Sequence, residues 1–182
     1  MTDYSTSMRT DRCGDLRVDD VGRQVTLCGW VDRRREHGEH LAFIDLRDRS
    51  GVVQLVVDGA HDLRSEYVLQ VSGTVRERPA DTANDGLATG AIEIDATDVT
   101  VLAAAEPPPF PLDERTEVDE MLRLKYRYVD LRRPRLQRNL EVRARVNSAV
   151  RGAMEEQGFV EVETPMLIAS TPEGARDFVV PS

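Results

Sequence analysis

The sequence predicts an all-β barrel of five strands, followed by a linker and by the start of an α+β domain. Three observations predict this arrangement. Apolar and polar residues alternate over most of the first hundred positions, a proline-rich segment follows, and the spacing of apolar residues then becomes that of helices. We expect the first domain to span residues 1–103, the linker 104–117 and the second domain 118–182.

The composition is that of a folded protein, with 40% hydrophobic and 31% charged residues. No apolar run approaches the roughly 20 residues of a membrane helix, and the N-terminus lacks the apolar segment of a secretory signal. We therefore expect a cytoplasmic protein with no membrane partner. The net charge of −9 argues against bulk electrostatic binding of DNA or RNA. It does not exclude RNA binding through a local strip of basic residues, because salt screens distant charges. The cysteines and histidines have no metal-binding spacing, so no metal site is predicted, and Cys28 is expected to be a buried thiol.

Five strands are predicted in the first domain, after a polar lead-in (1–15) and a helical turn or loop (16–22). They span residues 24–34, 41–47, 52–57, 66–78 and 91–102. A short helix is expected at 59–65, and Gly29 is expected to mark a bulge or bend. Three strands, a short helix and two further strands are the order of the OB-fold, a Greek-key barrel that binds oligonucleotides.

The linker sequence AAAEPPPFPLD predicts an extended, stiff spacer. After it, helices are predicted at 118–130 and 135–157, the second with an apolar stripe and with Gly158 as its C-terminal cap. A strand is expected at 159–167, ending at Pro165.

An aromatic and an amide side chain form the first candidate site. If Ile44 and Leu46 face the core, Phe43 must face water, where it neighbours Gln54 on the next strand. An exposed ring beside an amide suits a single-stranded base, because the ring stacks and the amide reads an edge. In the alternative interpretation the two faces are exchanged and Phe43 packs inside.

Charged residues form two further candidates. Arginines gather at 33–35 and at Arg76 and Arg78, where they could contact phosphates. The alternative is a solvated face, with ion pairs to Asp32, Glu36 and Glu77. Glu93, with Asp95, could accept hydrogen bonds from guanine-like N–H groups. No nucleophile–base pair, glycine-rich phosphate loop or carboxylate dyad is recognisable.

Four segments of the chain resemble the N-terminal third of bacterial-type aspartyl-tRNA synthetases, which are class II enzymes. The segments are VTLCGWVDRRR, FIDLRDRSGVVQL, LKYRYVDLRRP and GFVEVETPMLIASTPEGARDFVVPS. Lysyl-tRNA synthetases share the OB-fold, the RYxDL run and the strand that ends in TP. The run TPEGARDF is similar to the aspartyl enzymes in particular, and the resemblance extends from about Cys13 to Ser182.

The resemblance implies specific roles. The barrel would bind the tRNA anticodon: Phe43 would stack on the central uridine, Gln54 would hydrogen-bond it, and Glu93 would read the first anticodon position. Arg35, Arg76 and Arg78 would lie on or near the anticodon loop. The long helix, the strand after it and Pro165 match class II motif 1, which forms a homodimer interface in the family, and Glu173 matches a residue that helps to hold L-aspartate.

The implied reaction has two steps. Aspartate attacks the α-phosphate of ATP, with Mg²⁺ accompanying the nucleotide, and the resulting aspartyl-adenylate then transfers aspartate to tRNA-Asp. The arginines of motifs 2 and 3 that support this chemistry have no counterpart in the sequence. We therefore expect an incomplete catalytic domain with no catalytic residue, an N-terminal fragment that alone is inactive and binds neither ATP nor Mg²⁺.

Some family members also charge tRNA-Asn, a choice linked to two loops that here hold His37 and the pair Asp81 and Thr82. The histidine resembles the type that charges both tRNAs, whereas the second loop does not decide between the types. A competing interpretation of the whole chain is a non-catalytic paralogue, an OB-fold module that binds RNA or dimerises.

Overall fold

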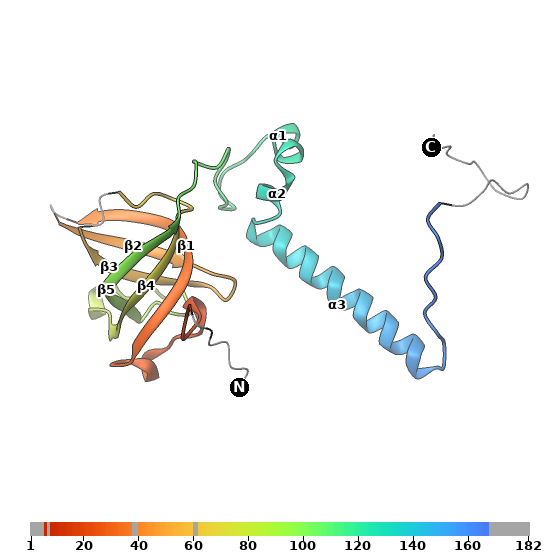
Figure 1. The fold of residues 1–182 in the computed structure, drawn as a ribbon, viewed down its shortest axis with the longest axis horizontal. Helices are drawn as coiled ribbons and strands as arrows, with labels where there is room; N and C mark the ends of the chain where they lie inside the picture. The colour runs from red at the N-terminus through yellow and green to blue at the C-terminus, as the bar shows by residue number, and fades with distance from the viewer. Residues whose placement is uncertain (1–5, 7, 38–39, 60–61, 168–182) are drawn as a thin grey trace, which may run out of the picture. The chain divides into compact units, whose positions relative to one another are not determined.

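A computed structural model describes residues 6, 8–37, 40–59 and 62–167 of the chain, which divides into two compact units, Met1–Pro109 and Phe110–Ser182 (Figure 1). The first unit is a closed barrel with the strand order β1-β2-β3-β5-β4. Its strands are β1 (Gln24–His37), β2 (Leu41–Arg47), β3 (Val52–Asp58), β4 (Val68–Glu77) and β5 (Ile92–Ala103). All neighbouring strands are antiparallel except β3 and β5, which are parallel. The predicted OB-fold barrel is confirmed.

Alternation along the strands builds the barrel core. Leu27 in β1, Ile44 and Leu46 in β2, and Leu55 in β3 are fully buried, and the residues between those of β2 are only partly buried. A shift of one residue would turn every apolar side chain outwards, so this burial pattern fixes the strand register. Phe43 therefore lies on the outer face, and the alternative with exchanged faces is wrong.

Strand β1 serves both halves of the barrel. Its first half pairs with β4 and its second half with β2, and the register shifts between Val31 and Arg33. Such a bulge bends a strand, which lets one strand turn between two neighbours. We expected a bulge or bend at Gly29. Gly29 instead permits a close approach, since a Cβ there would lie 2.6 Å from the carbonyl oxygen of Arg47.

Two residues before β1 belong to the core, one of them in the segment predicted as a polar lead-in. Cys13 and Leu16 are buried with the core residues of the barrel. The backbone N–H of Cys13 donates to Asp48 Oδ2 at 3.0 Å, which fastens this segment to the turn between β2 and β3. Cys28, predicted to be buried, is only partly buried, and its thiol donates to the carbonyl oxygen of Met8.

The described residues of the segment predicted as a helix, 59 and 62–65, form no helix. The two residues directly after it pair with β1: the Glu66 N–H donates to Val31 O at 2.7 Å, and the Val31 N–H donates to Tyr67 O at 2.9 Å. Glu66 takes a left-handed conformation with φ of 66°, and Arg47 Nη2 donates to both of its carboxylate oxygens.

The second unit contains α1 (Glu120–Lys125), α2 (Arg127–Asp130) and α3 (Pro134–Glu156). The single helix predicted at 118–130 is divided at Tyr126, whose backbone is not helical. Asp119 caps α1 by accepting from the N–H of Leu122. Pro134 opens α3 at the position where proline is tolerated, and Gly158, with φ of +83°, follows its end as predicted. None of the described helices is long and apolar enough to cross a membrane.

The strand predicted at 159–167 is wrong, since these residues form no regular structure. An isolated strand leaves its backbone groups unpaired, and the described part of this unit, 110–167, contains no other strand. The apolar side chains of the segment are exposed, as are those along α3, none of whose residues is buried.

Candidate nucleic-acid interface

A cavity of about 350 Å³ lies on the outer face of the barrel. Its lining includes all six residues predicted to contact the anticodon: Arg35, Phe43, Gln54, Arg76, Arg78 and Glu93. These residues come from all five strands and from the end of β4, so the barrel gathers side chains that lie up to 58 positions apart between Arg35 and Glu93 in sequence. The cavity is the candidate site.

Strand pairing explains this convergence. Arg35 is paired with Phe43 across β1 and β2, and Gln54 is paired with Asp45 across β2 and β3. Arg76 is paired with Glu93 across β4 and β5. Because directly paired residues project to the same side of a sheet, the five strands present these side chains on one surface.

A chain of hydrogen bonds runs through the polar residues of the cavity. Arg35 Nη2 donates to Asp45 Oδ1 at 2.9 Å and to Gln54 Oε1 at 3.0 Å. Gln54 Nε2 donates to Glu93 Oε2 at 2.8 Å, and Arg76 Nε donates to Glu93 Oε1 at 2.9 Å. The Glu93 carboxylate is thus compensated on both oxygens, which a buried charge requires.

Gln54 and Glu93 are more buried than predicted. Strand parity put both on the outer face, which is correct, but they are only 6% and 4% exposed. The bonds from Arg35 and Arg76 bring long arginine side chains against them. These bonds therefore hold the polar groups of Gln54 and Glu93 in place in the wall of the cavity.

Arg78 carries a donor that no described residue satisfies. The residue is 9% exposed, its Nε donates to Ile92 O at 2.8 Å, and its buried Nη2 has no hydrogen-bond partner within the described part of the chain. Burial lowers the pKa of this guanidinium, while the carboxylates of Glu93 and Asp45 oppose the shift. A buried donor without a partner is costly, and the Arg78 side chain lines the cavity.

Phe43 is partly buried, and its ring meets His37 edge-on, with the ring centroids 5.6 Å apart. His37 therefore adjoins the cavity through Phe43. Of the other two predicted discrimination residues, Thr82 lines the cavity and Asp81 does not. Pro165 is exposed, and Glu173 lies outside the described residues.

For the arginines at 33–35 the two interpretations were phosphate contacts and a solvated face with ion pairs, and the structure gives a different answer for different residues. Arg34 pairs with Glu36, as expected for a solvated face, whereas Asp32 pairs with Arg47. Arg35 alone of the three reaches the cavity. Glu77 is exposed at the end of β4.

Asp45 and Asn84 were missed by sequence reasoning. Asn84 lines the cavity from the loop before β5, where no periodic pattern points to it. Asp45 shares the outer face with Phe43, a parity that could have identified it. Burial raises the pKa of its carboxyl, and the charge of Arg35 counteracts this rise.

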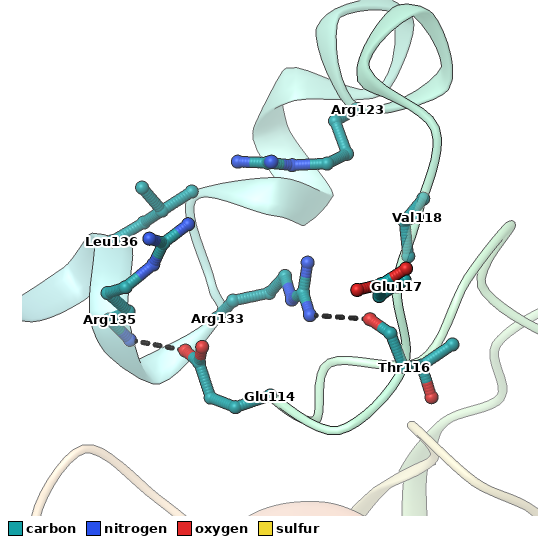
Figure 2. Close-up of a pocket in the computed structure, with 8 residues that line it drawn as sticks. All are labelled: Glu114, Thr116, Glu117, Val118, Arg123, Arg133, Arg135 and Leu136. Atoms are coloured by element: carbon teal, nitrogen blue, oxygen red, sulfur yellow. Dashed lines mark hydrogen bonds between the residues drawn. The ribbon is translucent and has the colours of Figure 1, made fainter.

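A second cavity of about 420 Å³ lies within the second unit, lined by three arginines and two glutamates among other residues (Figure 2). The side chains of Arg123 and Arg133 already have partners within this unit. Arg133 is buried and donates to the carbonyl oxygens of Asp113 and Thr116, and the backbone N–H of Arg135 donates to Glu114 at 2.6 Å. These bonds fasten the segment before α1 to the start of α3.

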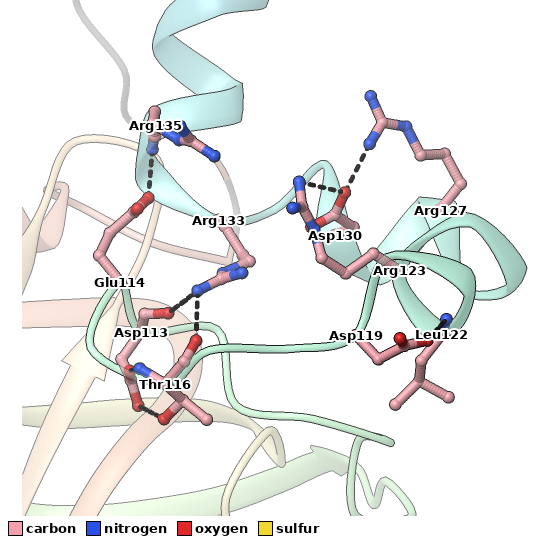
Figure 3. A network of polar contacts seen from close by, with 10 residues as sticks. All are labelled: Asp113, Glu114, Thr116, Asp119, Leu122, Arg123, Arg127, Asp130, Arg133 and Arg135. Atoms are coloured by element: carbon pink, nitrogen blue, oxygen red, sulfur yellow. Dashed lines mark hydrogen bonds and ion pairs between the residues drawn. The ribbon is translucent and has the colours of Figure 1, made fainter.

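A separate set of polar contacts in this unit surrounds a buried carboxylate (Figure 3). Asp130 is fully buried and accepts from Arg123 Nε at 2.9 Å and from Arg127. Burial opposes ionisation, but the hydrogen bonds and charges of Arg123 and Arg127 outweigh it and lower the pKa of Asp130. We interpret this cluster as structural. Across the described residues, no three histidine, cysteine or acidic side chains are grouped to hold a metal ion.

Comparisons with known proteins agree with both units. Residues 25–102 match the family described as OB-fold nucleic acid binding domain, and residues 119–182 match tRNA synthetases class II (D, K and N). The chain is 52% identical, over 96% of its length, to an aspartate–tRNA(Asp/Asn) ligase of Natranaerobius thermophilus, of which it covers 31%. It thus spans about a third of the length of such relatives.

Solved structures show the same fold. Asparaginyl-tRNA synthetase from Pyrococcus horikoshii, complexed with asparaginyl-adenylate, is 27% identical, with a TM-score of 0.73 over 90% of this chain and 38% of that one. Aspartyl-tRNA synthetase from Entamoeba histolytica is 19% identical, with a TM-score of 0.79 over 95% of this chain and 43% of that one. With both family matches and this identity over nearly its whole length, the chain belongs to the aspartyl-tRNA synthetase family of class II.

Proposed function

We propose that this chain acts as part of an aspartate–tRNA ligase and that its barrel binds the anticodon of tRNA-Asp. The convergence of Arg35, Phe43, Gln54, Arg76, Arg78 and Glu93 on one cavity carries the proposal. The complete reaction joins L-aspartate to tRNA through aspartyl-adenylate, with ATP and Mg²⁺, in the cytoplasm, where tRNA is charged. We assign no catalytic, nucleotide or metal contact to the described residues.

The side chains suit an unpaired RNA loop. Phe43 supplies a ring for stacking on the central base, and Gln54 supplies an amide for its edge. Glu93 accepts N–H groups of the first anticodon base. Arg35, Arg76 and Arg78 supply guanidinium donors at the cavity lining, with the charges of Arg35 and Arg76 balanced by Asp45 and Glu93.

The second unit supports two further assignments. The apolar stripe of α3 is exposed, with Leu140, Val146 and Val150 each at least 47% accessible. We assign this helix, with Pro165, to a homodimer interface, since an uncovered apolar stripe suits a second subunit. Glu173 is assigned to binding of the aspartate substrate.

tRNA-Asn is proposed as a second substrate. The relative from Natranaerobius thermophilus is named as a ligase for both tRNAs. His37, which contacts Phe43, and Thr82, at the rim of the cavity, adjoin the proposed anticodon site. The test is to charge both tRNAs with a longer protein that contains this chain; failure with tRNA-Asn alone would refute dual specificity.

Binding of an RNA hairpin with the aspartate anticodon tests the proposed site. The 182-residue chain should bind this hairpin more tightly than one with a scrambled loop. Phe43→Ala should weaken binding about 5- to 150-fold, because stacking is worth roughly 1–3 kcal/mol per base. Trp30→Ala is the matched control, since Trp30 is an accessible barrel aromatic outside the cavity lining. Equal affinity for the two hairpins would refute the proposal.

Pyrophosphate exchange separates binding from catalysis. We expect the 182-residue chain to show no aspartate-dependent exchange, because the residues proposed to activate ATP lie outside it. An aspartate-dependent signal would contradict that assignment and leave anticodon binding untouched.

A further inference from the structure

We propose that Arg35 and Glu93 hold the side-chain amide of Gln54 in a single orientation, with Asp45 positioning Arg35, and that this fixed orientation distinguishes uracil from cytosine. The inference rests on the proposed anticodon function, in which Gln54 contacts the central base. It adds the physical means of selection and assigns a positioning role to Asp45.

Two charged groups flank the Gln54 amide. Its Oε1 accepts from Arg35 Nη2 at 3.0 Å, and its Nε2 donates to Glu93 Oε2 at 2.8 Å. A guanidinium only donates hydrogen bonds, and an ionised carboxylate only accepts them. A rotated amide would place its N–H₂ against the guanidinium and its oxygen against the carboxylate.

Burial makes the rotated state costly. Gln54 is 6% exposed and Glu93 4%, so water has little access to replace the two lost bonds. Unpaired polar groups lose more in such surroundings than in solvent. The carboxylate is also fixed from its other side, since Arg76 Nε donates to Glu93 Oε1. The amide therefore has one stable orientation before any ligand arrives.

The flanked amide keeps one N–H and one oxygen lone pair for a ligand, because each amide atom has used one of its two sites. Uracil offers a carbonyl acceptor next to a ring N–H donor. Cytosine has nearly the same shape but offers an amino donor next to a ring nitrogen acceptor, the reverse order. An amide free to rotate could serve either base, whereas a fixed amide matches only one.

Asp45 completes the arrangement from outside the cavity lining. Its Oδ1 and Gln54 Oε1 share the same Arg35 Nη2. The Arg35 side chain is 43% exposed, so without Asp45 it could turn towards solvent. Asp45 is thus a positioning residue that acts on the base through Arg35 and Gln54.

The test measures the ratio of affinities of the 182-residue chain for two hairpins, with uridine or cytidine at the central anticodon position. Fluorescence anisotropy of labelled RNA gives each dissociation constant. The unmodified chain should prefer uridine by about tenfold or more, the range for a bidentate base contact. Glu93→Gln lets the flanking group donate or accept, so the preference should fall to about threefold or less. Asp45→Asn should reduce the preference by about threefold.

Asp95→Asn is the matched control for Asp45→Asn. Asp95 also pairs with an arginine on this face, Arg76 at 3.3 Å, but it has no bond to Arg35 or Gln54 in the described structure. The Asp95→Asn variant should therefore keep the preference for uridine. A third hairpin, altered at the first anticodon position, isolates the proposed direct contact of Glu93, and Asp45→Asn should leave discrimination at that position unchanged.

The outcomes separate the two proposals. If the unmodified chain binds the aspartate hairpin specifically but Glu93→Gln and Asp45→Asn both keep its uridine preference, the amide-orientation proposal is overturned and anticodon binding stands. If the unmodified chain does not distinguish the aspartate hairpin from a scrambled one, both are overturned. If circular dichroism shows that Glu93→Gln does not fold, the ratio of uridine to cytidine hairpin affinities of Asp45→Asn decides.

Discussion

The barrel and the helical unit use apolar residues in opposite ways. In the barrel, each strand contributes buried leucine or isoleucine side chains, and Leu27, Ile44 and Leu55 have no accessible surface. In α3, Val142, Val146 and Val150 are more than half exposed. A closed barrel buries its inner face within itself, whereas a single helix needs another element to cover its stripe. The first unit therefore covers its own apolar core, whereas the apolar stripe of α3 is left uncovered by the described residues.

Hydrogen exchange should show the largest difference between the units. Core amides of β1 to β5 should exchange at least about 1000-fold more slowly than unstructured amides, because they open only with global unfolding. Amides of α3 should be slowed by only about tenfold, since a helix without packing is marginal. Mass spectrometry of peptic peptides measures both. Protection of α3 that rises with protein concentration would support the proposed homodimer; strong protection in the dilute monomer would contradict the comparison.

Truncation of apolar residues should affect the two units unequally. Ile44→Ala removes a fully buried side chain and should lower the free energy of unfolding by about 2–5 kcal/mol. Val146→Ala removes an exposed one and should change barrel stability by less than about 0.5 kcal/mol. Urea unfolding followed by the fluorescence of Trp30, the single tryptophan, reports on the barrel. Equal losses of unfolding free energy in Ile44→Ala and Val146→Ala would refute this difference between the two units.

Acid should weaken the polar cluster of the helical unit. Although burial opposes it, Arg123 and Arg127 lower the folded pKa of Asp130, so the stability from this carboxylate is present above its unfolded pKa of about 3.9. That stability is lost as the pH falls through the lower folded value. The NMR resonance of the Arg123 Nε–H should therefore shift with a midpoint below about 3.9. A midpoint above that value would contradict the assigned ion pairs, and Asp130→Asn should abolish the transition.

The two cysteines should give the smallest effect. Burial raises the pKa of both thiols, and that of Cys13 is raised well above its usual value. In native protein, N-ethylmaleimide should modify Cys28 at least about tenfold faster than Cys13. Ile44→Ala should speed labelling of Cys13, and Val146→Ala should not. Mass spectrometry identifies the modified residue, and equal rates in native protein would contradict the burial of Cys13.

Alternation predicted the barrel and much of its candidate site. Because the side chains of a strand change face at every residue, the burial of Ile44 and Leu46 was enough to place Phe43 outside. Periodicity carries no information about side-chain length or cross-strand bonds. It therefore missed the arginines that bury Gln54 and Glu93, and the sharing of Arg35 between Gln54 and Asp45.

The wrong predictions depended on partners distant in sequence. Residues 159–167 alternate as a strand does, but the described chain offers them no neighbouring strand. The segment predicted as a helix at 59–65 leads into backbone pairing with Val31. Cys13 lies in a polar stretch and is buried because Asp48 and the barrel hold it. Local composition reports none of these contacts.

The parallel junction of β3 and β5 gives the Gln54–Glu93 bond a second consequence. These strands are paired at only two positions, Leu55 with Ile94 and Val56 with Asp95, so this is the shortest seam of the barrel. The bond from Gln54 to Glu93 bridges the same seam from the outer face. A substitution that alters base preference at Gln54 or Glu93 therefore also alters how firmly the barrel closes. Variants selected for a new anticodon would need compensating changes along β3 and β5 to keep these two strands paired.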